Sequence, residues 1–154
     1  MIKPAHILLV EDNRMDVELT LDAFREARLG NTIHVCGNGQ QALDYLYGRE
    51  TYTDRTRYPL PDLILLDLKL PGVNGHEVLR QIKSEPLIKR IPVVILTSSR
   101  EDGDRALSYD LGVNSYLVKP VSFENFLQIV REASTYWLVV NVSPPDPPIT
   151  YEIK

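Results

Sequence analysis

Residues 63–75 read LILLDLKLPGVNG, and this stretch decides which fold we expect. Its first four residues form an unbroken apolar run, which is typical of a strand buried on both faces of a parallel sheet. Asp67 follows directly, and a buried carboxylate without partners costs several kcal/mol. The position of Asp67 therefore indicates that other charged groups of the chain meet it at the end of this strand.

The rest of the chain alternates short β-rich runs with amphipathic helical patterns. Strands are predicted at residues 5–10, 32–36, 62–67, 91–99 and 114–120. Helices are predicted after Asn13, which can cap the segment from Val17 to Arg28, and at residues 40–47, 74–84, 101–111 and 123–137. Five strands alternating with five helices predict an α/β fold, with a single doubly wound parallel sheet in the order 2-1-3-4-5.

The composition is that of one ordinary globular domain of 154 residues, and its formal net charge of −4 argues against direct binding of nucleic acid. A single cysteine, Cys36, excludes an internal disulfide and is typical of a reducing compartment. No apolar run approaches the roughly 18 residues that a membrane span needs. We therefore expect a cytoplasmic protein that does not bind membranes.

Polar residues follow four of the predicted strands at the point where each strand ends. They are Glu11 and Asp12, Asp67, Thr97 with the two serines after it, and Lys119. Since ligands of a doubly wound sheet bind outside the carboxyl ends of its strands, we expect these side chains to line one pocket. Each residue taken alone could have an ordinary structural role, as a helix cap, a turn residue or a surface lysine. Their joint placement favours a functional site.

Three carboxylates in one pocket repel one another unless a cation neutralises them. An all-oxygen ligand set suits a hard ion, and Mg²⁺ fits because it accepts a few carboxylates and keeps several waters. A lysine can contact phosphate as a point charge, and a hydroxyl can donate a hydrogen bond to a phosphoryl oxygen. The predicted constellation is thus suited to transferring a phosphoryl group onto a carboxylate.

Four segments of the chain are similar to a known family: LLVEDN (8–13), LILLDLKLPGVNGHEVL (63–79), PVVILTSS (92–99) and ALSYDLGVNSYLVKP (106–120). They resemble the receiver domain of two-component response regulators, and the resemblance covers residues 5 to about 135. It implies a flavodoxin-like receiver fold for residues 1–138. Residues 139–154 would form a proline-rich C-terminal extension.

The resemblance also implies which residues form a metal site. Asp67 would be the phosphoacceptor and would contact Mg²⁺. Asp12 would bind the ion directly, Glu11 would act largely through water, and the backbone carbonyl of Lys69 would complete the protein ligands.

Further roles follow from the same resemblance. Lys119 would pair with the phosphoryl group, Thr97 would hydrogen-bond a phosphoryl oxygen, and Tyr116 would be the switch aromatic that moves with Thr97. Lys69 and Ser99 occupy positions that tune dephosphorylation in the family. The protein would not be an enzyme with a separate substrate. It would be a phosphoacceptor that assists its own phosphoryl transfer and autodephosphorylation.

Two segments narrow the kind of response regulator that the chain resembles. Residues 49–61, RETYTDRTRYPLP, lack a clean period and are predicted to form a long surface loop. This loop and the segment REASTYWLVV (131–140) resemble receivers that work with phytochrome-type histidine kinases. The resemblance implies a stand-alone response regulator that accepts a phosphoryl group from such a sensor kinase in a phosphorelay.

The last predicted helix is apolar on two faces. Its inward stripe runs from Phe123 to Trp137, and a second stripe contains Ile129, Tyr136 and Val140. Such a helix either sits in a larger core or covers a partner. We therefore expect a homodimer through the face of helix 4, strand 5 and helix 5, with an interface of Ile129, Tyr136, Trp137 and Val140. A C-terminal tail that folds back over Tyr136 is the alternative.

Other functions are consistent with parts of the pattern. A constitutive dimeric scaffold, whose acidic pocket binds Mg²⁺ without being phosphorylated in function, stays open as an alternative. A phosphatase with an aspartyl nucleophile would require a second acid two residues after Asp67, where Lys69 stands instead. Residues 37–42, GNGQQA, match a dinucleotide-binding fingerprint, but they follow the second strand rather than the first. We therefore expect no nucleotide cofactor.

Overall fold

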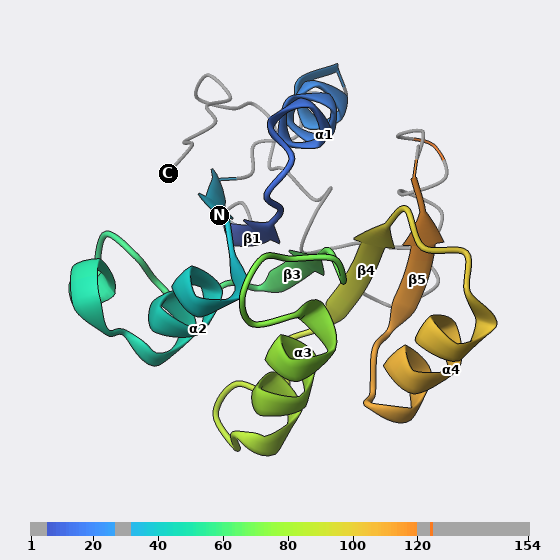
Figure 1. The fold of residues 1–154 in the computed structure, drawn as a ribbon. Coiled ribbons are helices and arrows are strands. Elements are labelled where there is room, and N and C mark those ends of the chain that lie inside the picture. Colours follow the sequence, from blue (N-terminus) through green and yellow to red (C-terminus); the bar gives the residue numbers. More distant parts are fainter. Residues whose placement is uncertain (1–5, 27–31, 120–123, 125–154) are drawn as a thin grey trace.

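A computed structural model describes residues 6–26, 32–119 and 124 of the protein (Figure 1). Its strands are β1 (His6–Val10), β2 (Thr32–Cys36), β3 (Leu63–Leu66), β4 (Val93–Thr97) and β5 (Ser115–Val118). They pair in parallel in the order β2-β1-β3-β4-β5, which confirms the predicted sheet. The helices are α1 (Arg14–Glu26), α2 (Gly39–Tyr47), the short 3₁₀ helix η1 (Glu50–Tyr52), α3 (Gly75–Ser84) and α4 (Asp102–Asp110).

Four α-helices lie within the described residues, whereas five were predicted for the whole chain. The fifth, at residues 123–137, falls outside the described residues apart from Glu124. The predicted interface residues and extension lie there too: Ile129, Tyr136, Trp137, Val140 and residues 139–154. Among the described residues, no helix has the length and apolar character that crossing a membrane requires.

β3 is buried on both faces, as its unbroken apolar sequence predicts. Leu63 and Leu65 pack in one cluster with apolar side chains of α1, whereas Ile64 and Leu66 pack in another with side chains of α2 and α3. Figure 1 shows the same two layers, with α1 on one side of the sheet and α2, α3 and α4 on the other. Because both faces of β3 are packed, the strand is a rigid support for the residue that follows it.

Asparagine side chains mark where three of the helices begin. Asn13, Asn38 and Asn74 each accept a hydrogen bond from the backbone N–H three residues later, at 3.1, 2.8 and 3.0 Å. These bonds satisfy N–H groups that have no partner inside the helix. α4 ends before Gly112, whose φ of 96° lies in the left-handed region that glycine favours.

Gly75 brings the first turn of α3 against the chain that follows β3. A Cβ at this position would lie 2.4 Å from the carbonyl oxygen of Asp67 and 2.5 Å from the Cα of Leu68. The Gly75 N–H donates to the Leu68 carbonyl at 2.9 Å. The absence of a side chain therefore lets α3 hold the backbone of Asp67 in place at the end of its strand.

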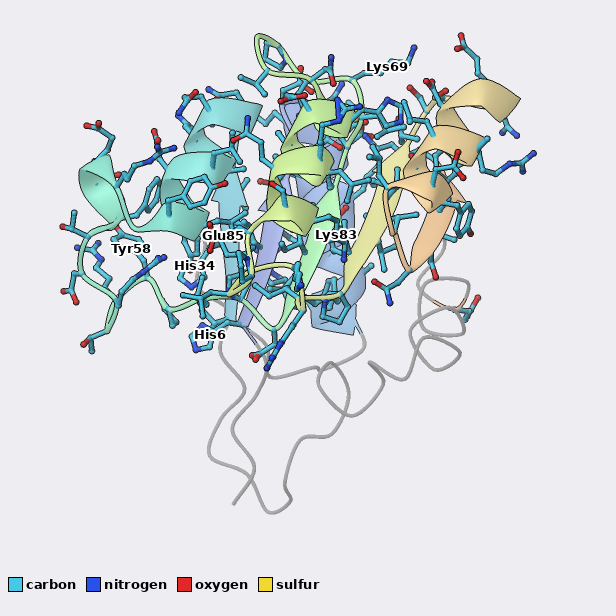
Figure 2. The ribbon with its side chains drawn as sticks, turned by 90° about the horizontal axis from the view of Figure 1, so that it is seen from below. His6, His34, Tyr58, Lys69, Lys83 and Glu85 are labelled. Atoms are coloured by element: carbon cyan, nitrogen blue, oxygen red, sulfur yellow. The ribbon has the colours of Figure 1, made fainter. Side chains whose placement is uncertain are left out.

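The segment 49–61 connects α2 to β3 without an α-helix or strand, and most of its residues are exposed, which confirms the predicted surface loop. It contains η1, and its Tyr52 and Tyr58 pack with Tyr45 of α2 at ring-centroid distances of 5.0 to 5.9 Å. His34 of β2 joins these tyrosines, with its ring 6.1 Å from that of Tyr58 (Figure 2). The sequence pattern did not predict this packing, because the aromatic side chains pack individually, without the regular period that a helix or strand shows in a sequence.

Arg55 attaches this segment to the C-terminal end of α2. Its guanidinium donates to the carbonyl oxygens of Tyr45 at 2.6 Å, Leu46 at 2.7 Å and Tyr58 at 3.0 Å. The last carbonyls of a helix have no partner within the helix and carry a partial negative charge. Arg55 therefore satisfies two of these carbonyls and compensates the helix dipole at the same time.

Arg55→Gln should lower the free energy of unfolding by about 2 kcal/mol, because it removes charge-assisted hydrogen bonds to carbonyls at the helix end. Chemical denaturation followed by circular dichroism measures the change. Arg57→Gln is the matched control, since Arg57 lies over the ring of Tyr58 at 5.3 Å and such an exposed contact contributes only about 0.5 kcal/mol. Equal losses in the two variants would contradict a capping role for Arg55.

Candidate functional site

Predicted site residues stand at the ends of neighbouring strands. Glu11, Asp67 and Lys119 come one residue after β1, β3 and β5, and Thr97 is the last residue of β4. Their backbones continue the hydrogen bonding of the sheet: Asp67 N donates to the Val10 carbonyl at 3.0 Å, and Lys119 N donates to the Thr97 carbonyl at 2.8 Å. The sheet itself therefore carries these side chains to one edge.

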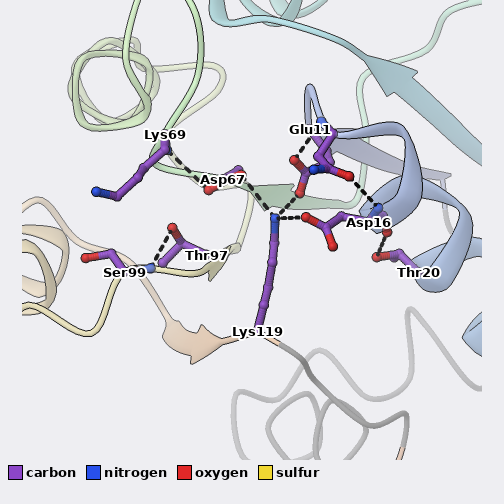
Figure 3. A network of polar contacts seen from close by, with 9 residues as sticks. Glu11, Asp16, Thr20, Asp67, Lys69, Thr97, Ser99 and Lys119 are labelled. Atoms are coloured by element: carbon purple, nitrogen blue, oxygen red, sulfur yellow. Dashed lines mark hydrogen bonds and ion pairs between the residues drawn. The ribbon is translucent and has the colours of Figure 1, made fainter.

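The ammonium group of Lys119 lies among three carboxylates (Figure 3). It donates to Glu11 Oε1, to Asp16 Oδ2 at 3.0 Å and to Asp67 Oδ2 at 3.1 Å. An ammonium group has three N–H donors, and these carboxylates accept all of them. The contacts are shielded from water, because the side chains of Lys119, Glu11 and Asp67 are only 16%, 3% and 7% exposed.

Charge in this cluster is only partly balanced. Burial would lower the pKa of Lys119, but its hydrogen bonds to Glu11 and Asp16 and the charge of Asp67 raise the pKa overall, so the lysine is held as a cation. Burial raises the pKa of Glu11 to about 7, against the opposing hydrogen bond from Lys119. One lysine therefore does not compensate all the carboxylates, and a further cation would favour their ionised forms.

Asp12 adds a carboxylate to the open side of the cluster. Carboxylate oxygens of Glu11, Asp12 and Asp67 all lie within 4.8 Å of one another, with Asp12 exposed and the other two buried. The Lys69 N–H donates to Asp67 Oδ1 at 3.2 Å, which orients that carboxylate. Oxygen atoms at this spacing suit Mg²⁺ or Mn²⁺. The residues present therefore fit a divalent cation beside Asp67.

Thr97, Ser99 and Tyr116 form a second network next to this cluster. Thr97 is fully buried, and its Oγ1 accepts a hydrogen bond from Ser99 N at 3.3 Å. The Ser99 carbonyl accepts from the Tyr116 hydroxyl at 3.1 Å, and Ser99 Oγ donates to Asp104 of α4 at 2.5 Å. A movement of Thr97 toward Asp67 would therefore change the contacts of both Tyr116 and α4.

Asp16 is the residue of the lysine cluster that was not predicted. It lies in the first turn of α1, whereas the prediction considered only residues at strand ends. A signal was present in the sequence, because a helix that begins directly after the cap residue Asn13 places its first turn at the same edge as Glu11 and Asp12. An acid in that turn is therefore a neighbour of the pocket.

The sequence matches the response regulator receiver domain family over residues 7–131, a span that contains every residue of both networks. The chain belongs to this family. The receiver domain that the sequence segments resemble is thus confirmed, together with its five-stranded parallel sheet.

Receiver proteins of several origins are similar to the chain. The bacteriophytochrome response regulator RtBRR is 48% identical, with a TM-score of 0.80 over 93% of this chain and 86% of that chain. "Probable methanogenesis regulatory protein FilR2" of Methanothrix harundinacea is 45% identical over 92% of this chain and 88% of its own length. Response regulator Rcp1 of Synechocystis sp. is 38% identical over 88% of this chain and 90% of its own. The crystal structure of the Mn²⁺-bound form of Rcp1 has a TM-score of 0.74, at 37% identity over 93% of this chain and 100% of that chain.

Lys119→Gln should lower the free energy of unfolding by about 3 kcal/mol when divalent cations are chelated, because buried carboxylates lose the cation that pairs with them. Chemical denaturation measures the loss. Adding Glu11→Gln to this variant should recover part of it, since one of the unpaired acids is then neutral. A Lys119→Gln variant as stable as the unmodified protein would contradict the electrostatic account of the cluster.

Proposed function

We propose that the chain is a response regulator in which Asp67 accepts a phosphoryl group from a sensor histidine kinase. The observation that carries the proposal is the arrangement around Asp67, which ends a buried strand beside the Lys119 ammonium and within 4.8 Å of the acids Glu11 and Asp12. Membership of the receiver family supports it. Phosphorylation would switch a surface that contacts other proteins.

Transfer to Asp67 forms a bond between a carboxylate oxygen and phosphorus and breaks the P–N bond of a phosphohistidine. The imidazole nitrogen of the kinase keeps the electron pair of that bond and takes up a proton. Such a reaction asks mainly for positioning and for neutralisation of the phosphoryl oxygens. Lys119, whose Nζ lies 3.1 Å from Asp67 Oδ2, is placed to contact one of these oxygens.

Mg²⁺ is the cation that we assign to the acidic cluster. Asp12 and Asp67 would hold it through their side chains, Glu11 largely through water, and Lys69 through its backbone carbonyl. Mg²⁺ supplies positive charge next to the phosphoryl oxygens when it is bound. Binding of Mn²⁺ by Rcp1, a relative of 37% identity, supports a divalent cation in this chain.

The second network would convert phosphorylation into a change of surface. A phosphoryl group replaces the single charge of Asp67 by about −1.5 to −2 and adds acceptor oxygens. Thr97 would donate to one of them, and Tyr116 would leave the Ser99 carbonyl and follow. To move the α4–β5 face from 1:99 to 99:1 in favour of the active state, phosphorylation must contribute about 5.5 kcal/mol.

A phytochrome-type kinase is the phosphoryl donor that we assign, because RtBRR, a bacteriophytochrome response regulator, is 48% identical to the chain. The receiver domain would span residues 1–138, in keeping with the family match over 7–131, and residues 139–154 would extend from it. A homodimer through the interface predicted above would place two switched faces together. Autodephosphorylation in the same pocket would end the signal.

A constitutive scaffold that binds Mg²⁺ without being phosphorylated is the second candidate. The pKa of Glu11, raised to about 7, favours it as well, since binding a cation alone would relieve the excess of negative charge. The two functions differ in what they ask of Asp67. The scaffold uses only the charge of its carboxylate, whereas the response regulator uses its reactivity.

Incubation with Mg²⁺ and phosphoramidate should add one phosphoryl group to the unmodified protein and none to Asp67→Asn, because the amide is not a nucleophile for phosphorus. Intact-mass spectrometry measures the gain. Asp22→Asn, which changes an exposed acid of α1 that pairs with Arg25, is the matched control and should be phosphorylated normally. A protein that binds Mg²⁺ but gains no phosphoryl group would favour the scaffold instead.

Mg²⁺ should raise the thermal stability of the protein, because it binds the folded cluster and not the unfolded chain. At a free concentration 100 times the dissociation constant, the stabilisation is about 2.7 kcal/mol. Differential scanning calorimetry measures it, with NaCl at matched ionic strength to account for screening. Asp12→Asn should largely abolish the effect and Asp22→Asn should keep it. An equal response of both variants would show that the ion binds elsewhere.

A further inference from the structure

Asp16 contacts Lys119 from outside the group of acids that fits a metal ion. Its Oδ2 accepts a hydrogen bond from Lys119 Nζ at 3.0 Å, as close as the contact between that lysine and Asp67 (Figure 3). Within the described residues, the acids that lie close enough together to hold a metal ion are Glu11, Asp12 and Asp67. Asp16 is not part of this group. Asp16 therefore contacts the Lys119 ammonium group but is not one of the acids that would bind the metal ion.

The backbone of Asp16 is fixed on both sides. Its N–H donates to the side chain of Asn13 at 3.1 Å, and its carbonyl accepts from the Thr20 hydroxyl at 2.9 Å. The residue is the third of α1, where a carboxylate is also favoured by the positive end of the helix dipole. Its side chain is 31% exposed, so it reaches Lys119 from the solvent side of the pocket.

Glu11 and Asp67, the other two partners of Lys119, have competing roles when the site binds a metal ion and a phosphoryl group. Glu11 and Asp67 are both members of the acid group that fits a divalent cation, which attracts their oxygens. Asp67 in addition becomes the phosphoryl carrier in the function proposed above. Of the three carboxylates on the ammonium group, Asp16 is thus the one whose contact can stay the same before, during and after phosphoryl transfer.

We propose that Asp16 is a positioning residue for phosphoryl transfer, which anchors the Lys119 ammonium to the first turn of α1 and keeps it aimed at the phosphoryl group on Asp67. The inference rests on the proposed function of Asp67. A lysine has a long, flexible side chain with three rotatable donors, so a fixed acceptor removes conformations in which the charge points away from the site. Misplacing a group that stabilises a transition state costs rate even where binding is unchanged.

The test measures phosphorylation by phosphoramidate at saturating Mg²⁺, over a range of donor concentrations. Asp16→Ala should lower the maximal rate about fivefold, the cost of one hydrogen bond of ordinary strength, and leave the half-saturating donor concentration unchanged. Asp16→Asn should stay within about twofold of the unmodified protein, because the amide oxygen still accepts from Lys119. Asp22→Ala, an exposed acid on the same helix, is the matched control and should not change the rate.

A second readout reports on the lysine itself. In ¹⁵N spectra of the side-chain ammonium groups, the Lys119 signal should be sharp in the unmodified protein and in Asp16→Asn, and broadened by exchange with water in Asp16→Ala. The dissociation constant for Mg²⁺ should be the same in Asp16→Asn and Asp16→Ala, since both variants lose the same charge and Asp16 is not one of the acids that fit the metal. A role of Asp16 in folding alone would change the unfolding temperature without separating Asn from Ala in rate.

The outcomes separate this inference from the function on which it rests. If the protein is phosphorylated on Asp67 but Asp16→Ala matches it in maximal rate and in the Lys119 signal, the positioning role is wrong and the response-regulator function stands. Equal losses in Asp16→Ala and Asp16→Asn, or a rate increase in both, would mean that Asp16 acts through its charge and would also overturn the inference. If the unmodified protein is not phosphorylated at all, the two proposals fall together.

Discussion

The contact of one ammonium group with three carboxylates is the interaction on which the site depends. Lys119 joins Glu11 and Asp67, which are distant in sequence, on a single edge of the sheet. Without that cation, buried carboxylates this close together could not stay ionised. With the Lys119 cation in place, the pocket still carries more negative than positive charge. This excess of negative charge favours binding of a divalent ion, and of a phosphoryl group when the metal ion is bound beside it.

The fold supplies the precision that this cluster needs. Asp67 is carried by a strand that is packed on both faces, and Gly75 lets α3 lie against its backbone. The hydrogen-bond ladder continues for one residue beyond β3 and β5, so that Asp67 and Lys119 are extensions of the sheet rather than parts of mobile loops. Thr97 lies at the same edge of the sheet, at the end of β4. It accepts a hydrogen bond from Ser99, which in turn contacts Tyr116 and α4.

The parts of this arrangement that follow from strand periodicity were predictable. An unbroken apolar run identifies β3, alternation of strands and helices gives the sheet order, and parallel strands bring Glu11, Asp67 and Lys119 to one edge. Asp16 was not predicted as a site residue, because its position depends on where α1 begins and not on where a strand ends. The packing of residues 49–61 was not predicted for a different reason. Its tyrosines pack individually, and Arg55 caps α2 from outside that helix, so neither feature produces a periodic pattern in the sequence.

The most direct test of the account is to locate the phosphorylated atom chemically. An aspartyl phosphate is an acyl phosphate, and borohydride reduces it to homoserine, which mass spectrometry of peptides identifies at a single position. After phosphorylation in the presence of Mg²⁺, the account predicts homoserine at position 67 and at no other acid. Homoserine at Asp12 or Asp16, 5-hydroxynorvaline (the reduction product of a glutamyl phosphate) at Glu11, or a phosphate that resists borohydride on a serine or threonine, would contradict it.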